Sequence, residues 1–155
     1  MSKKIIYRQH GFTLLESLIA LVVLSVGMLG IAALYVEGLK AGRTAIYRTT
    51  AVSLTSDMMD RIRANPVARD DYELGGATSG CINGGNDCTA TELAQEDRLV
   101  WDTEVAERMP AGTETNIEVT FGANVDTYAI SVTWPEPGYE EDLDYTITAD
   151  LPGPL

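Results

Sequence analysis

The hydrophobic positions near the start of the chain form one long apolar stretch. Between residues 12 and 36 nearly every position is apolar or small, and Glu16 is the only charged residue. A helix of these 25 residues would be about 38 Å long, enough to cross a hydrocarbon core of about 30 Å. This stretch therefore predicts a membrane-spanning helix, in which a lone carboxylate is costly and suggests a function.

The next stretch keeps a helical period but has only one apolar face. Its apolar residues recur every three or four positions. They are Tyr47, Ala51, Leu54, Met58 and Ile62. Asp60, Arg61 and Arg63 would then lie on the opposite, solvated face. No proline occurs before Pro66, so we predict one helix over residues 12–64.

The remaining residues, 65–155, are expected to form a globular head. Residues 64–90 are rich in glycine and turn residues and predict irregular structure. A second helical period spans 91–109, with Thr91 as its candidate N-cap and Pro110 beyond its end.

Three segments then alternate between apolar and polar residues, as half-buried strands do. Their apolar positions are Ile117, Val119 and Phe121; Tyr128, Ile130, Val132 and Trp134; and Leu143, Tyr145 and Ile147. The connections, Gly122–Asp126 and Pro135–Asp142, are short enough for an antiparallel sheet. We expect the apolar stripe of the long helix to cover one sheet face, which makes the fold class α+β.

Charge is distributed unevenly along the chain. Lys3, Lys4 and Arg8 precede the apolar stretch, which places the N-terminus in the cytoplasm and the head outside. From residue 64 onward there are 19 acidic and three basic residues. Such an acidic surface repels phosphate backbones, so we expect no direct nucleic-acid binding.

The two cysteines, Cys81 and Cys88, are separated by six residues in a glycine-rich stretch. Disulfides persist in the oxidising compartments outside the cytoplasm, so one bridge closing a small loop fits the sequence. Two free thiols are the alternative. A zinc site would need more sulfur or imidazole ligands, and the only histidine is His10.

The N-terminal sequence is the most specific signal in the chain. Residues 8–17 read Arg-Gln-His-Gly-Phe-Thr-Leu-Leu-Glu-Ser and continue into the apolar stretch. This arrangement resembles the N-terminus of type IV prepilins and the related pseudopilins. The resemblance implies that a prepilin peptidase cuts between Gly11 and Phe12, removes the leader 1–11, and leaves an N-methylated Phe12. It also implies the pilin fold, a long N-terminal helix packed on an antiparallel sheet.

Within this family the chain is most similar to the PilV type of minor pilin. The similarity lies in Ser25–Leu34, Asp57–Pro66 and Ala129–Trp134. It implies a low-abundance subunit that acts with other minor pilins, the major pilin and the inner-membrane assembly platform to initiate pilus assembly. The head would lie in the periplasm and, after assembly, in the fibre or at its tip. The alternative within the family is a minor pseudopilin of a type II secretion system.

The expected role of Glu16 follows from its isolation. After cleavage, Phe12 would carry a positive amine, and in apolar surroundings Glu16 needs a partner. That amine, from the same or a neighbouring subunit, is the nearest candidate, so the pair can set the axial register between subunits. The alternative is a carboxylate that reaches to the membrane interface.

A periplasmic enzyme tethered by one helix is a more distant reading. The mature chain would contain no histidine and no recognisable nucleophile–base pair, and we expect no cofactor. Acidic residues occur side by side at Asp70-Asp71 and at Glu140-Glu141-Asp142, but adjacent carboxylates in turns are usually solvated.

Calcium binding is a further alternative. Asn83–Asp87 and Glu140–Asp144 are rich in oxygen ligands, but neither has the spacing of an EF-hand loop.

Overall fold

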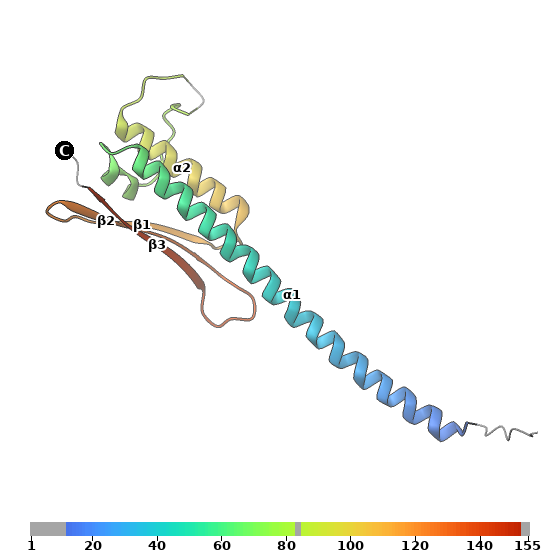
Figure 1. Cartoon of the computed structure of the whole chain (residues 1–155). Helices are drawn as coiled ribbons and strands as arrows, with labels where there is room; N and C mark the ends of the chain where they lie inside the picture. The colour runs from blue at the N-terminus through green and yellow to red at the C-terminus, as the bar shows by residue number, and fades with distance from the viewer. Residues whose placement is uncertain (1–11, 83–84, 153–155) are drawn as a thin grey trace, which may run out of the picture. The chain divides into compact units, whose positions relative to one another are not determined.

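The computed structural model describes residues 12–82 and 85–152, in two units, Met1–Arg43 and Thr44–Leu155. Figure 1 shows the order of elements along the chain. Helix α1, Leu14–Ala64, begins in the first unit and ends in the second. The predicted helix is thus present, but it begins two residues after Phe12, because the Thr13 carbonyl accepts the first helical hydrogen bonds, from the backbone N–H groups of Glu16 and Ser17.

The part of α1 in the second unit has the predicted buried stripe. Ala51, Leu54, Met58 and Ile62 are at most 1% exposed, whereas Asp60 lies on the solvated face. The helix ends at Ala64, where the Asn65 N–H still reaches the helical carbonyls of Arg61 and Ile62 before Pro66. Proline cannot continue the helix, so the end lies where the sequence predicts.

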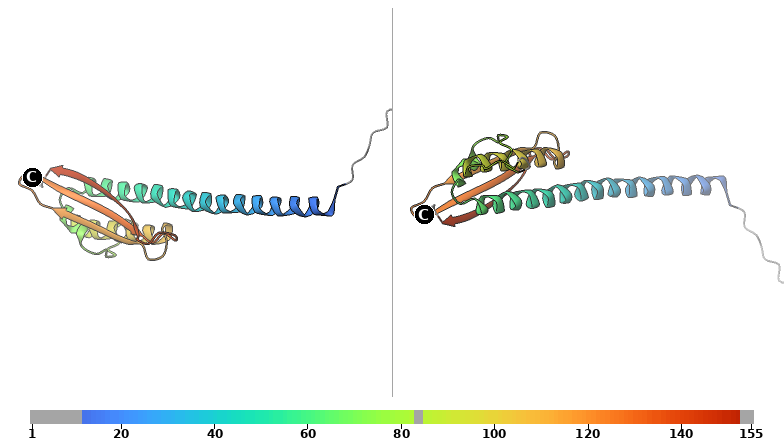
Figure 2. Two further views of the ribbon diagram at one scale, coloured as in Figure 1. Left: turned by 90° about the horizontal axis from the view of Figure 1, so that it is seen from below. Right: turned by 90° about the horizontal axis from the view of Figure 1, so that it is seen from above.

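The three predicted strands form one antiparallel sheet in the order β1-β2-β3. Their bounds are Glu114–Thr120 for β1, Val125–Trp134 for β2 and Leu143–Pro152 for β3. Ile117, Ile130 and Ile147 stand in one row across the sheet. Figure 2 shows the sheet as one layer, with α2 and the end of α1 against one of its faces.

The prediction for Phe121 was wrong. This residue follows the last residue of β1 and is 60% exposed. The chain turns there: the Gly122 N–H donates to the Asp126 carboxylate at 3.1 Å. A Cβ atom on Gly122 would come within 2.1 Å of the Val125 carbonyl oxygen, so only glycine fits this turn. Phe121 is therefore carried off the inner face of the sheet.

Helix α2, Ala90–Arg108, corresponds to the second predicted helix, but its N-cap is Thr89 rather than Thr91. The Thr89 hydroxyl accepts from the Glu92 N–H, and the Glu92 carboxylate accepts from the Thr89 N–H at 2.8 Å. This reciprocal capping box satisfies two backbone donors at once. Thr91 is already helical and exposed.

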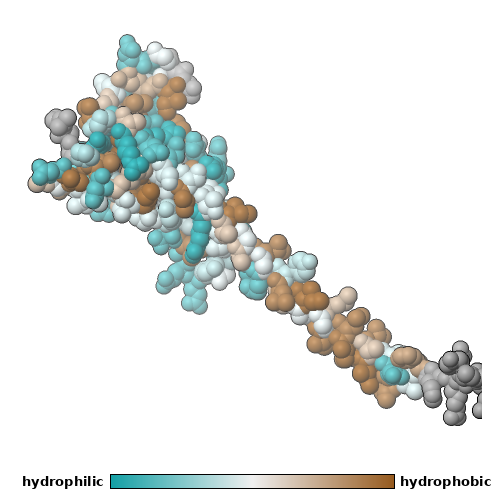
Figure 3. Space-filling model, in the orientation of Figure 1, coloured by the Kyte–Doolittle hydropathy of each residue, from teal (hydrophilic) through white to brown (hydrophobic). Residues whose placement is uncertain are grey.

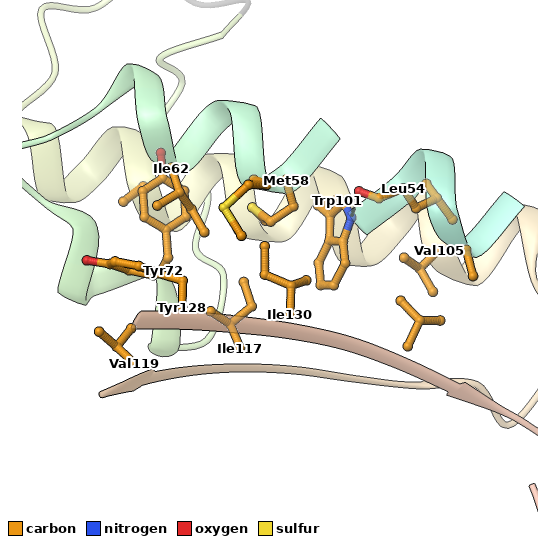
Figure 4. Packing of buried hydrophobic residues seen from close by; sticks show 14 of the residues in the cluster. Leu54, Met58, Ile62, Tyr72, Trp101, Val105, Ile117, Val119, Tyr128 and Ile130 are labelled. Atoms are coloured by element: carbon orange, nitrogen blue, oxygen red, sulfur yellow. Dashed lines mark hydrogen bonds between the residues drawn. The ribbon is translucent and has the colours of Figure 1, made fainter. Parts of the chain in front are cut away.

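The hydrophobic core of the second unit lies between the two helices and the sheet (Figure 4). Its largest fully buried side chains are Trp101, Trp134, Tyr72 and Tyr128. Tyr72 comes from a short 3-10 helix, η1, Arg69–Glu73, within the segment predicted to be irregular. The apolar alternation of β2 is nearly complete, since its four predicted inner residues are all 0% exposed.

Candidate functional site

The first candidate site is the start of α1. Phe12 is 81% exposed, and the Thr13 hydroxyl accepts from the Glu16 N–H at 3.3 Å. Thr13 thus caps the helix, and Glu16 is the only acidic residue of its first turn. A carboxylate at this end is favoured by the helix dipole. Phe12 and Glu16 are four residues apart, about one helical turn, whereas Gly11 and the rest of the predicted leader lie outside the described residues.

The apolar half of α1 exposes its side chains all round in the part of the chain that the structure describes. All residues from 12 to 42 are exposed, and Leu14, Leu21, Leu29 and Leu34 are each more than 60% exposed. Figure 3 shows brown, hydrophobic side chains along most of this stretch. Among the described residues, α1 is the one helix whose length and composition would allow it to cross a membrane. So large an apolar surface requires lipid or other protein around it, and it fits inner-membrane anchoring.

The second candidate feature is the cysteine loop. Cys81 and Cys88 form a disulfide with a Cα–Cα distance of 5.8 Å. The Cys81 N–H donates to the buried Glu96 carboxylate at 2.6 Å, which attaches the loop to α2. The bridge closes a short loop, and it stabilises the fold mainly by restricting the unfolded chain.

A polar cluster joins the end of α1 to α2. Arg61 donates to Asp57 and to Asp97, both at 2.9 Å, and the Tyr72 hydroxyl donates to Asp97 at 3.0 Å. Burial alone would lower the pKa of Arg61, but its hydrogen bonds to the two carboxylates outweigh burial and raise that pKa. Burial, followed by the negative charge of Asp97, also raises the pKa of Tyr72. These shifts keep Arg61 charged and Tyr72 neutral at neutral pH, as is typical of structural groups.

A second cluster surrounds Arg98, which is only 8% exposed. Its guanidinium group donates to Asp102, to the Tyr72 carbonyl and to the Thr115 hydroxyl, and lies 5.3 Å from the centre of the Trp101 ring. A buried charge needs such partners to be tolerated. Arg98 therefore ties together α2, η1 and β1.

Potential metal ligands do not converge in the part of the chain that the structure describes. No group of three or more His, Cys, Asp or Glu side chains is placed to hold a metal ion there. Glu140, Glu141 and Asp142 are exposed in the loop before β3. Asn83, from the other candidate calcium segment, lies outside the described residues.

Sequence reasoning missed both polar clusters. It placed Arg61 on the solvated face, but the Arg61 side chain is only 24% exposed because it forms an ion pair with Asp97 of α2. A partial signal was present: Asp57 with Arg61, and Arg98 with Asp102, are each four residues apart on a helix. The contacts between elements, such as Tyr72 with Asp97, have no such signal.

Two protein-family models match the chain. The model of the prokaryotic N-terminal methylation motif matches residues 6–32. The model of type IV pilin Tt1218 matches residues 33–99. Searches of curated proteins and of solved structures found no match.

The two matches cover consecutive parts of the chain, from residue 6 to residue 99, about the middle of α2. The structure adds a long helix with an apolar first half and a three-stranded antiparallel sheet. Pilins are a family of structural proteins. The chain belongs to the type IV pilin-like family.

Proposed function

We propose that this protein is a minor pilin of a type IV pilus that helps to initiate pilus assembly. The observation that carries the proposal is the lone Glu16 in the first turn of the apolar half of α1, within the segment that matches the methylation motif. A carboxylate in that position is unfavourable in lipid unless another group neutralises it. Assembly with other subunits would supply that group and cover the apolar surface of α1.

Processing would generate the assembling form. Cleavage between Gly11 and Phe12 by the prepilin peptidase would remove Lys3, Lys4 and Arg8, and would leave a methylated amine on Phe12. This amine would lie about one turn from Glu16 and could pair with it in the same or a neighbouring subunit. The Phe12 side chain is already exposed, so α1 does not bury the new N-terminus.

Charge and redox chemistry support a periplasmic location for the head. The basic leader favours a cytoplasmic N-terminus, and the Cys81–Cys88 bridge suits an oxidising compartment. The partners would be other minor pilins, the major pilin, the assembly platform and membrane lipid.

A pilus is favoured over a type II secretion pseudopilus by two features. The segment 57–66, which includes the end of α1, resembles the corresponding segment of PilV-type minor pilins, and the head carries the cysteine loop. The Gly11–Phe12 junction and Glu16 are expected in both systems and do not separate them.

The test is mass spectrometry of surface fibres sheared from cells that express the full chain. We expect a methylated peptide that begins at Phe12, at low abundance relative to the major pilin, and loss of fibres when the gene is deleted. A chain that remains attached to its leader in the exported form would contradict the proposal. Normal fibres together with loss of protein secretion on deletion would instead identify a pseudopilin.

A further inference from the structure

The two edges of the head's sheet differ in how they are protected. At the β1 edge, η1 lies alongside the strand and the Glu73 carboxylate accepts a hydrogen bond from the Val119 N–H. Thr115, on the same strand, is held by Arg98 and Asp102. The chain itself therefore contacts this edge near both ends of β1, at Thr115 and at Val119.

The β3 edge has no comparable cover. β3 is ten residues long and pairs only with β2. Within the described residues, the one further hydrogen bond to its backbone comes from Arg69, at the carbonyl of the last strand residue, Pro152. An edge strand of this length leaves a row of backbone donors and acceptors that another strand can use.

The inner face of β3 is also incompletely buried. Leu143, Tyr145 and Ile147 are only partly buried, whereas Trp134, Val132 and Ile130, their register partners on β2, are 0% exposed. The inner face of the sheet is thus less buried at β3 than at β2. A strand added there would extend the sheet and cover the remaining apolar surface of these three residues.

The opposite face of β3 carries negative charge. Its outward residues Asp144 and Asp150 lie on either side of Thr146 and Thr148, and all four are exposed. The sequence from residue 64 onward has 19 acidic and three basic residues. A second copy of the head would bring like charges together, which disfavours pairing of two β3 edges.

From these observations we propose that the β3 edge binds an extended segment of a different polypeptide. The segment adds a fourth strand, with apolar side chains beside Tyr145 and Ile147 on the inner face. Its outward face carries Lys or Arg residues opposite Asp144 and Asp150. Backbone hydrogen bonds supply affinity in this mode, and the alternating side chains supply specificity.

The first test uses the full-length chain in detergent micelles and three synthetic peptides of about ten residues, the length of β3. One peptide alternates Val or Ile with Thr and Lys, the second has Glu in place of Lys, and the third has the residues of the first in scrambled order. Binding is measured by fluorescence anisotropy against empty micelles. We expect the alternating Lys peptide to bind at least about tenfold more tightly than either of the others.

Two matched variants place the peptide on one edge. Glu114 and Asp144 stand in the same row of the sheet, on opposite edges, and both are exposed. Asp144→Lys should weaken binding of the Lys peptide about fivefold, and Glu114→Lys should change it less than about twofold. In case Asp144→Lys alters the fold, Thr148→Lys and Thr120→Lys form a second pair, one on each edge. Equal weakening by both members of a pair would show general charge attraction and overturn the proposal.

Hydrogen exchange on the same samples gives an independent readout. The Lys peptide should protect the backbone amides of β3 and leave those of β1 unchanged. Protection of β1 alone, equal binding of the scrambled peptide, or β3 protection that grows with protein concentration in the absence of peptide would each contradict the proposal. The last result would identify a second copy as the occupant.

A photo-crosslinking residue at Thr146 tests the same site in assembled fibres. The crosslinked peptide should come from another protein and should alternate apolar residues with Lys or Arg. A crosslink to this chain itself would overturn the proposal, as would one to an acidic segment.

Discussion

At the scale of single residues, the described structure contains both a charge without an ionic partner and charges that are buried with partners. Glu16 has no cationic partner among the described residues, and it lies in an apolar helical stretch. Arg98, by contrast, is buried with partners from three elements. A charge that is already paired stabilises the fold of one chain, whereas an unpaired charge in apolar surroundings creates a need for another group.

Replacement of Glu16 should therefore affect assembly more than folding. Glu16→Leu should reduce incorporation into fibres by more than about tenfold, because the cost of an unpaired carboxylate, several kcal/mol, no longer favours one register. Ser25→Leu is the control, since it removes a polar group from the same stretch without removing a charge. Immunoblots of sheared fibres and of membranes give the ratio, and equal incorporation of both variants would contradict the role of Glu16.

The two buried tryptophans allow a second prediction at this scale. The Trp101 indole N–H donates to the Leu54 carbonyl at 2.8 Å, whereas the Trp134 N–H has no partner in the described structure. Trp101→Phe should lower the free energy of unfolding by about 1–2 kcal/mol more than Trp134→Phe, because only the former loses a hydrogen bond. Denaturant unfolding followed by circular dichroism checks this, and a larger loss for Trp134→Phe would contradict it.

At the scale of elements, helix ends and turns depend on local partners. The start of α2 is fixed by the reciprocal bonds of Thr89 and Glu92, and the hydrogen bonds from Thr89 lower the pKa of Glu92. The sequence contains Thr89 and Thr91 within three positions, and either is an acceptable N-cap by residue type. The Glu three residues after Thr89 is the feature that favours the earlier start.

The two threonines give a matched test of this cap. Thr89→Ala should destabilise the head by about 1 kcal/mol, because the Glu92 N–H loses the hydroxyl that accepts its hydrogen bond. Thr91→Ala should change the stability by less than about 0.5 kcal/mol, because Thr91 is an exposed helical residue. Thermal unfolding of both variants is sufficient, and a greater effect at position 91 would place the helix start later than the structure does.

The chain also passes very close to α2 at Gly76. A Cβ atom there would lie 2.5 Å from the Leu99 backbone, whereas one on Gly75 would meet nothing within 4 Å. Gly76→Ala should therefore cost about 1–3 kcal/mol, and Gly75→Ala should be close to neutral. Chemical denaturation of the pair tests the contact, and equal stability of the two variants would contradict it.

At the scale of the whole molecule, the two units of the chain suit different surroundings. The first unit exposes an apolar helix, and the second combines a buried core with a strongly acidic sequence. The first unit requires lipid or other subunits, and the second folds around its own core. The stability of the second unit therefore depends on its own core. The pH dependence of that stability should report the titratable groups buried there.

Alkaline pH should destabilise the head. Burial raises the pKa of Tyr128 to about 12, with further contributions from Asp70 and Asp126, and burial raises that of Tyr72 as well. In the unfolded chain tyrosine ionises near pH 10, so only the unfolded state loses these protons at first. The free energy of unfolding should be unaffected by these groups below about pH 10 and should fall as the pH rises through about 12.

Substitution of single tyrosines tests this dependence. Tyr128→Phe should reduce the loss of stability between about pH 10 and 12, and Tyr139→Phe should not, because Tyr139 is 55% exposed. Denaturant unfolding at each pH measures the difference. An unchanged slope in Tyr128→Phe would show that other groups control alkaline unfolding.

Residues whose behaviour depends on near neighbours were predictable. The periods of three to four in Tyr47–Ile62 and of two in Tyr128–Trp134 identified the buried faces before any contact was known. The prediction for Phe121 was wrong because the alternating pattern continues one position beyond the strand. The turn at Gly122 decides where the strand ends. The prediction that Arg61 is solvated was wrong because its partner Asp97 lies 36 positions further along the sequence.

The sequence alone determined the apolar length of α1, the position of Glu16, the three strands and the acidic character of the head, because each depends on composition and local period. Only the tertiary structure decided which edge of the sheet is covered and how the buried Arg98 is neutralised. These outcomes depend on contacts between elements far apart in sequence, such as Glu73 with Val119, and periodicity contains no information about them.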